Sequence, residues 1–351
     1  MRVALLAVAL AGPAAADPIR IATFAAPLSR DGPGLLLADI LDEDDAQIDA
    51  IRRVIDHAGP DVLLLTDFDF DAGGAALEAF ADTLANPLPH RFAARPNSGL
   101  ASGLDLDGNG RRGEARDAQG YGRFAGDGGL ALLARWPVAL QLDFSEMLWR
   151  DLPGATLPEG DVPGEDARAA QRLSSTAHWV LTVAHPDGPF SLLAWSATPP
   201  VFDGPEDMNG LRNRDELRLW QLWSEGRLGP PPEGPSVLLG NANLDPVDGE
   251  GYPDAMADLL ENSIWQDPRP ASEGGALAAD PGHGGDPALD TVDWDGPGNL
   301  RVSYVLPSRD WRVLDAGVIW PAPGSPDAEL LGEDGLAAGP HRLVWVDVTR
   351  D

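Results

Sequence analysis

The chain has 351 residues, of which 43% are hydrophobic, and its 25 Lys and Arg against 56 Asp and Glu give a formal net charge of −31. The apolar content, with 11 Trp, is enough for a packed core and excludes a globally disordered chain. The acidic surface disfavours general binding to DNA or RNA, because like charges repel. The absence of Cys excludes disulfides and thiolate metal sites.

The first sixteen residues have the pattern of an export signal. Arg2 gives a positive start, Val3–Ala11 form an apolar core, and Ala14–Ala16 offer a small-residue cleavage site. The alternative is an intracellular chain that begins with an alanine-rich strand or helix. No later apolar run approaches the roughly 18 residues that a spanning helix needs. We therefore predict a signal peptide at 1–16, export to the periplasm or the exterior, and no membrane span.

Strand and helix patterns alternate in the first half of the mature chain. Residues 19–25 alternate like a strand, and 61–69 form the near-continuous apolar run of a strand buried on both faces. Between them, residues 46–59 predict a helix with one apolar face: Ile48, Ile51, Val54 and Ile55. A long Gly- and Asp-rich loop follows over 91–128, and strand character returns over 129–140.

The second half continues the alternation. Residues 178–184 and 190–197 predict two strands joined by a hairpin turn, and 211–226 predict an amphipathic helix. Three further strands are predicted at 236–240, 300–308 and 341–348. Because strand patterns run from start to finish without a clean linker, we predict one α/β domain over 17–351.

Several motifs in chain order carry a family resemblance. They are IATF at 21–24, DVLLLTDFDFD at 61–71, SGLDLDGNG at 102–110, ATPPVFDGPEDMNGLRNRDELRLW at 197–220, GNANLDPVDGEG at 240–251, GNLRVSYVLPS at 298–308 and HRLVWVDV at 341–348. Together they resemble an exported bacterial branch of the endonuclease/exonuclease/phosphatase superfamily, over nearly the whole mature chain. The resemblance implies a four-layered α/β sandwich that hydrolyses phosphoesters with Mg²⁺ or Mn²⁺. It implies a small phosphoester or nucleotide as ligand, and we expect a monomer.

Three positions match or nearly match the family's site. The resemblance implies a metal ligand at Asp67, a retained amide at Asn243 and a catalytic histidine at His341. Each has a structural alternative, respectively a solvated carboxylate at a strand end, a turn residue that bonds its own backbone, and a strand-edge histidine. With Asn241, we take Asn243 and His341 as the candidate catalytic residues.

Five positions depart from the family's pattern. The resemblance leads us to expect Asn, His, Asp, Asp and Asp where the chain has Ala25, Ser196, Asn241, Ser303 and Pro340. The amide of Asn241 can donate a hydrogen bond, but it cannot take a proton or carry charge to a metal. Catalytic groups act as a unit, so we predict a degraded site with weak or no standard activity. The alternative is a non-catalytic periplasmic ligand-binding or structural protein.

A separate loop resembles the front half of a calcium-binding loop. Oxygen donors stand at positions one, three and five, with glycine at six: Asp105, Asp107, Asn109 and Gly110. Position twelve is Arg116 instead of the expected Glu, so Glu114 or Asp117 would have to replace it. The loop therefore predicts a structural Ca²⁺ held by Asp105, Asp107 and Asn109, and the alternative is an Asp/Gly turn without an ion.

Overall fold

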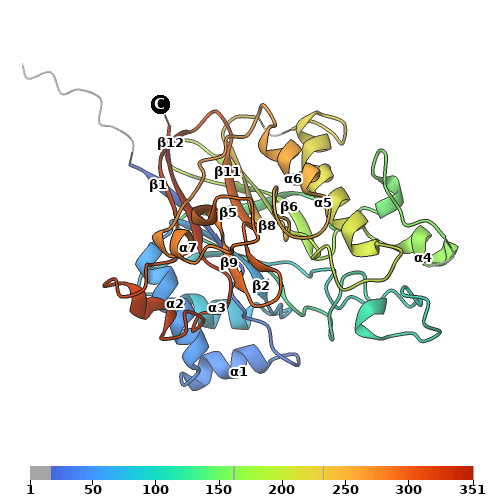
Figure 1. Cartoon of the computed structure of the whole chain (residues 1–351), viewed down its shortest axis with the longest axis horizontal. Coiled ribbons are helices and arrows are strands. Elements are labelled where there is room, and N and C mark those ends of the chain that lie inside the picture. The colour runs from blue at the N-terminus through green and yellow to red at the C-terminus, as the bar shows by residue number, and fades with distance from the viewer. Residues whose placement is uncertain (1–16, 161–162, 232, 351) are drawn as a thin grey trace, which may run out of the picture.

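The computed structural model describes residues 17–160, 163–231 and 233–350. The predicted signal peptide at 1–16 lies outside the described residues. Two mixed β-sheets form the centre of the molecule, with helices α1 to α3 gathered on one side and α5 and α6 on the other (Figure 1). This arrangement confirms the predicted α/β class.

The first sheet has six strands. In spatial order they are β12 (Arg312–Val318), β13 (Val344–Thr349), β1 (Ile19–Phe24), β2 (Val62–Phe68), β4 (Gly129–Ala134) and β3 (His90–Phe92). β1 runs parallel to β2, and the other neighbours are antiparallel. The predicted strands over 19–25 and 61–69 are thus neighbours in the sheet. They can run parallel because the helix between them returns the chain to the edge where the first strand began.

The second sheet has five strands. In spatial order they are β11 (Ser303–Pro307), β8 (Ser236–Asn241), β7 (Phe190–Ser196), β6 (Ala177–Val183) and β5 (Val138–Asp143). β6 and β7 form the predicted antiparallel hairpin, and β7 runs parallel to β8. A small ribbon pairs β9 (Val292–Trp294) with β10 (Gly298–Leu300).

The helices begin and end where local signals place them. They are α1 (Leu35–Asp42), α2 (Ala46–Ala58), α3 (Ala75–Asp82), α4 (Glu165–Ala170), α5 (Met208–Ser224), α6 (Pro253–Leu260) and α7 (Glu273–Leu277). At the start of α2 the Asp45 carboxylate accepts from the amides of Gln47 and Ile48, each at 2.9 Å. The same helix ends at Gly59, whose φ of 58° is left-handed and costs glycine little. In the part of the chain that the structure describes, no helix is long and apolar enough to cross a bilayer.

Strand alternation divides the interior into two cores. In β8, Val237 and Leu239 point into the core between the sheets, while Leu238 points into the core beneath α5 and α6. Trp220 of α5 and Met256 of α6 are fully buried in that second core. The sheets therefore pack face to face, with β1 against β8 and β11 and β2 against β7 and β8.

Two predicted strands are each divided between sheets. The run over 129–140 becomes β4 in the first sheet and β5 in the second, broken before Pro137, which has no amide to donate to a ladder. The run over 300–308 becomes β10 and β11, because the backbone amides of Arg301 and Val302 bond Asp245 and Thr291 side chains instead. β12 was not predicted, because most of its residues are exposed or half-buried and give no apolar run.

Candidate functional site

Three strand ends of the second sheet meet in one row. Asn241, the last residue of β8, pairs in register with Ser196 at the end of β7 and with Ser303 at the start of β11. All three residues are buried. Register thus gathers three of the five substituted positions at one place. The row presents two hydroxyls and an amide, and none of these side chains ionises near neutrality.

The two asparagines after β8 bond each other. The Asn243 amide donates to Asn241 Oδ1 at 3.1 Å, and Asn241 Nδ2 donates to Asn243 Oδ1 at 3.2 Å. Asn243 Nδ2 also donates to the Ala197 carbonyl at 2.8 Å. Its φ of 50° is a left-handed conformation that Asn tolerates better than most residues. These bonds give Asn243 the part of a turn residue that joins the ends of β7 and β8.

The neighbouring positions add no charge. Ala25 is buried directly after β1, the strand that packs against β8 and β11. Ser303 Oγ is buried without a hydrogen-bond partner, while the Ser303 amide donates to Thr291 Oγ1 at 3.0 Å. Neither side chain can supply a charged ligand to a cation or take up a proton near neutrality.

Asp67 lies near the end of β2, on the wall of a different cavity. This cavity has a volume of about 530 Å³, and its lining includes Arg123 and Asp127 but not Asn241, Asn243 or His341. Burial raises the pKa of the Asp67 carboxyl to about 6, against the opposing effect of a hydrogen bond from the Ser29 hydroxyl.

His341 is held by apolar packing. Its ring lies edge-on to Trp294, with centroids 5.3 Å apart, and its Nδ1 is buried without a hydrogen-bond partner. Desolvation lowers the pKa of His341 to about 4, and the charge of Arg342 lowers it further. The nearby Asp293 does not orient the ring, because its carboxylate accepts from Arg342 and its amide donates to the Pro340 carbonyl. A histidine in this state is neutral at pH 7, so it does not act there as a cationic acid.

The residues at the family positions do not fit the cation that the resemblance implies. A divalent cation for phosphoryl transfer needs hard, charged oxygen ligands at the reacting group. Asp67 is a single carboxylate in its own cavity, and the Ser196–Asn241–Ser303 row supplies none. Among the described residues, the one group of three or more His, Asp or Glu side chains close enough to share an ion lies elsewhere, in the loop over 105–117.

That loop brings three carboxylates together. Ligand atoms of Asp105, Asp107 and Asp117 lie within 4.8 Å of one another, and Asp117 is buried. Asp117 reaches the group because its Oδ1 accepts from the Leu106 amide at 2.9 Å, which folds the loop back on itself. Three carboxylates at this spacing match the hard oxygen donors that Ca²⁺ prefers.

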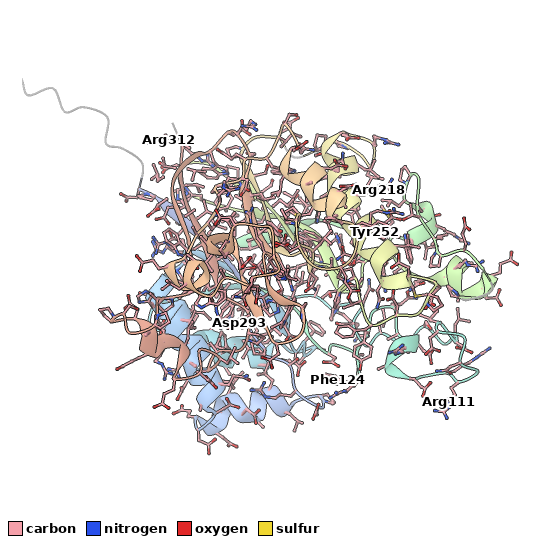
Figure 2. The ribbon with its side chains drawn as sticks, viewed as in Figure 1. Arg111, Phe124, Arg218, Tyr252, Asp293 and Arg312 are labelled. Atoms are coloured by element: carbon pink, nitrogen blue, oxygen red, sulfur yellow. The ribbon has the colours of Figure 1, made fainter. Side chains whose placement is uncertain are left out.

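The side chain of Asn109 links two carboxylates of the loop, those of Asp107 and Glu114. Its Nδ2 donates to Asp107 Oδ2 at 3.0 Å and to Glu114 Oε2 at 2.7 Å, while its Oδ1 accepts from the Arg111 amide. Figure 2 shows Arg111 at the outer edge of the molecule, so this part of the loop is open to solvent. The loop therefore turns through side-chain to backbone bonds within itself.

Sequence reasoning missed one further cavity, which lies where α5 begins. It has a volume of about 480 Å³ and is lined by parts of the segments 106–121 and 198–212. The only sequence signal was the presence of Tyr121 and Phe202 in Gly- and Pro-rich segments, where aromatic side chains have little core to join. Segments this far apart in the chain become neighbours only through the fold.

The chain was also compared with known proteins. The sequence model of the Endonuclease/Exonuclease/phosphatase family matches residues 40–334. No curated protein matches the chain.

Two solved structures are similar to the chain, and the likeness in fold rests on the first of them. An endonuclease/exonuclease/phosphatase from Beutenbergia cavernae DSM 12333 has 16% sequence identity and a TM-score of 0.54, covering 95% of this chain and 72% of that chain. A sphingomyelinase C from Streptomyces griseocarneus has 13% sequence identity and a TM-score of 0.48, and the match covers 95% of this chain and 99% of that chain. At these identities the likeness concerns the fold alone.

The depressed pKa of His341 predicts a specific loss of stability in acid. A histidine whose pKa falls from 6.5 to about 4 on folding contributes stability above pH 6.5 that is lost as the pH falls towards 4. Between pH 7 and pH 4.5 the free energy of unfolding of His341→Phe should fall by about 1–3 kcal/mol less than that of the wild type. The measurement is the free energy of urea unfolding of both proteins at pH 7 and pH 4.5.

His178 provides the internal control for that comparison. Burial lowers its pKa to about 3, so its contribution is the same in both proteins and cancels in the difference. An equal loss of stability in the wild type and His341→Phe would show that the ring is solvated in the folded protein.

The three-carboxylate group predicts a stabilising cation. Excess Ca²⁺ should raise the melting temperature by several degrees over a chelated sample, because an ion that binds only the folded state stabilises it. Asp105→Asn with Asp107→Asn should abolish the shift. The exposed pair Asp42→Asn with Asp44→Asn removes the same charge elsewhere and should preserve it. A melting temperature that does not change with Ca²⁺ would contradict the calcium site and favour the alternative, an Asp/Gly turn without an ion.

Proposed function

The chain belongs to the endonuclease/exonuclease/phosphatase family, and on that premise we propose that it is a member that has lost the standard metal-dependent hydrolysis of phosphoesters. The family reaction requires a charged ligand set, a general acid or base and a positioned water. The proposal is that the folded scaffold persists while those groups have been replaced by neutral ones.

One observation carries the proposal, namely the row of Ser196, Asn241 and Ser303. These residues pair with one another in register, and the row itself contains no carboxylate or imidazole. The side-chain amide of Asn241 is hydrogen-bonded to Asn243, so its role is to stabilise the turn. Electrostatic stabilisation of a phosphoryl group would have to come from elsewhere.

The two remaining ionisable candidates support the same conclusion. Asp67 faces a cavity that excludes the row, and the pKa of its carboxyl is raised to about 6 by burial. His341 is neutral at pH 7, with its Nδ1 desolvated and without a partner. No hydrogen bond or ion pair joins Asp67 to His341 among the described residues, so the two are not arranged as an acid–base pair.

The alternative function is ligand binding without turnover. The cavity of about 480 Å³ beside α5 favours it, because its size falls in the range of small-molecule sites. In this reading the family scaffold presents a binding cavity that does not include the substituted row.

An activity assay tests the loss of hydrolysis. Purified protein with Mg²⁺, Mn²⁺ or Ca²⁺ should cleave bis-p-nitrophenyl phosphate no faster than an EDTA-treated sample, because removing even one charged catalytic group costs several orders of magnitude. Metal-dependent turnover that disappears in Asp67→Ala or His341→Ala would overturn the proposal. Asp44→Ala, an exposed carboxylate in the α1–α2 connection, serves as the matched control.

We also propose that the protein is exported. The pattern of residues 1–16 supports this. The expected outcome is that protein recovered from the cell envelope or medium of an expressing bacterium begins at Asp17, as read by N-terminal sequencing. Recovery in the cytoplasm with residues 1–16 attached would contradict it.

A further inference from the structure

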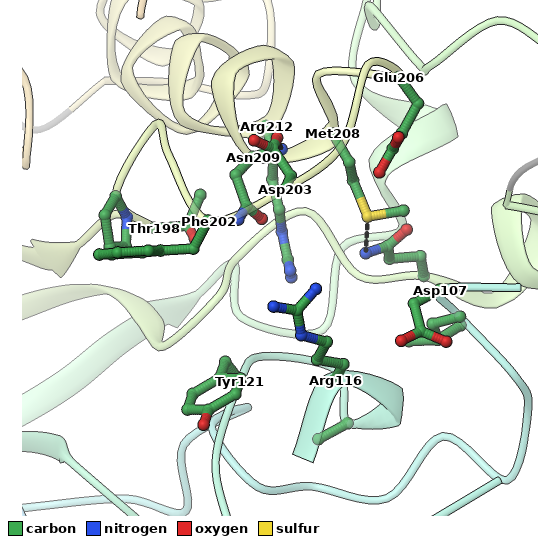
Figure 3. Close-up of a pocket in the computed structure, with 14 residues that line it drawn as sticks. Asp107, Arg116, Tyr121, Thr198, Phe202, Asp203, Glu206, Met208, Asn209 and Arg212 are labelled. Carbon is green, nitrogen blue, oxygen red and sulfur yellow. Dashed lines mark hydrogen bonds between the residues drawn. The ribbon is translucent and has the colours of Figure 1, made fainter. Parts of the chain in front are cut away.

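The cavity beside α5 is built around two arginines. Arg212 enters from α5 and Arg116 from the facing loop, and Figure 3 shows their guanidinium groups approaching each other in the middle of the cavity. The cavity has a volume of about 480 Å³. Two like charges facing each other repel unless something between them carries the opposite charge.

Arg212 is fixed in place and still has a free donor. The residue is only 5% exposed. Its Nε donates to the Leu173 carbonyl at 2.8 Å, and its Nη2 donates to the carbonyls of Arg172 and Ser174 at 2.9 and 3.0 Å and to that of Gln119. Within the described part of the chain its Nη1 has no hydrogen-bond partner, although it belongs to a buried cation. A buried guanidinium with a spare donor is a preorganised half of an anion site.

No carboxylate neutralises Arg212 by direct contact. Glu216 lies one helical turn along α5, but its carboxylate accepts from the Ser175 amide and hydroxyl and from the Thr198 amide. Burial raises the pKa of Glu216 to about 7, against these donors and the charge of Arg212. Burial therefore disfavours the charged form of Glu216, and its carboxylate makes no ion pair with Arg212 among the described residues.

Arg116 is the second unpaired charge. Its exposed guanidinium forms no ion pair or hydrogen bond with any residue that the structure describes, although the chain has a net charge of −31. Arg111 in the same loop, by contrast, pairs with Glu114. A free guanidinium in an acidic protein, aimed into a cavity, is the other half of the site.

Two aromatic rings lie on one side of the arginines. Phe202 is 76% exposed and Tyr121 is 65% exposed, and both line the cavity on the same side in Figure 3. Phe202 also has a φ of 70°, a left-handed conformation that is costly for a bulky residue. Large exposed rings at the edge of a cavity offer an apolar wall to a planar group.

Three carboxylates also line the cavity and limit what can bind. Asp107 and Glu206 lie on the side away from the rings in Figure 3, and Asp203 lies near the start of α5. Each already accepts from a nearby backbone amide: Asp107 from Asn109, Glu206 from Gly204 and Asp203 from Asn209. These bonds hold the carboxylates in their own loops, and the two arginines supply the cationic donors of the cavity, beside the buried Gln171 Oε1, an acceptor without a partner among the described residues.

We propose that this cavity binds a small organic oxyanion, its phosphate or carboxylate head between Arg116 and Arg212 and its planar ring against Tyr121 and Phe202. Bidentate guanidinium contacts suit either head group. The site involves no bond making or breaking. It goes beyond the proposed loss of hydrolysis, because none of Asn241, Ser303, Asp67 or His341 lines it.

The test is isothermal titration of the full chain in EDTA, which prevents a cation from bridging the anion. The probes are phenyl phosphate, benzoate, inorganic phosphate and benzyl alcohol. Phenyl phosphate or benzoate should bind, and the tighter of the two identifies the head group. Inorganic phosphate should bind about tenfold more weakly for lack of the ring, and benzyl alcohol should not bind.

Matched variants separate the site from general charge. Arg116→Gln should weaken binding of the ring-bearing anion about tenfold or more, because a charge-assisted contact is lost. Arg112→Gln removes the same charge from an exposed position of the same loop that does not line the cavity, and it should change the affinity less than about twofold. Phe202→Ser should weaken phenyl phosphate but not inorganic phosphate.

Three results would overturn the inference. They are no heat with any anion at 10 mM, equal weakening by Arg116→Gln and Arg112→Gln, or binding of benzyl alcohol as tight as that of phenyl phosphate. Arg116 is exposed, so its variant should fold, and circular dichroism verifies this. Release of phosphate from phenyl phosphate during the titration would contradict the proposed loss of hydrolysis and leave the binding result intact, so the two failures are distinguishable.

Discussion

The pairing register of β8 with β7 and β11 is the constraint on which the rest of this structure depends. It sets Ser196, Asn241 and Ser303 side by side, and through strand alternation it also decides which face of the sheet enters each core. A shift of one residue would exchange Val237 and Leu239 with Leu238 between the two cores. The neutral row is therefore as firmly specified as the cores themselves, although none of its three side chains carries a charge.

Helix α5 connects that row to the proposed anion cavity. Asn213 is fully buried and its Nδ2 donates to the carbonyls of Thr198 and Ala242, which follow β7 and β8. Arg212, the residue before Asn213, and Glu216, about one turn later, tie the helix to the segments around 119 and 172–175. Buried polar networks of this kind are costly unless fully satisfied. The Nη1 of Arg212 is the atom of this side chain whose donors no described residue takes up.

Much of the fold followed from local patterns, and the candidate site followed from them only in part. The apolar face of α2 and the run in β2 are local properties, so the helix and the buried strand could be read directly. The divided strands could not, because Arg301 and Val302 leave the ladder to bond the distant Asp245 and Thr291 side chains. Asp117 was considered as a calcium ligand, but only the folded loop shows that it lies near Asp105 and Asp107.

By itself the sequence determined the α/β class, the family resemblance and which side chains are chemically able to act, because these depend on residue type and local periodicity. Only the tertiary structure decided which residues share a place. It placed Asp67 in a cavity whose lining includes neither Asn241 nor His341, it packed the His341 ring edge-on to Trp294, and it turned Arg116 and Arg212 towards each other across 96 positions of sequence. Distances between such residues depend on sheet register and on packing between layers, and neither is encoded in any short stretch of the chain.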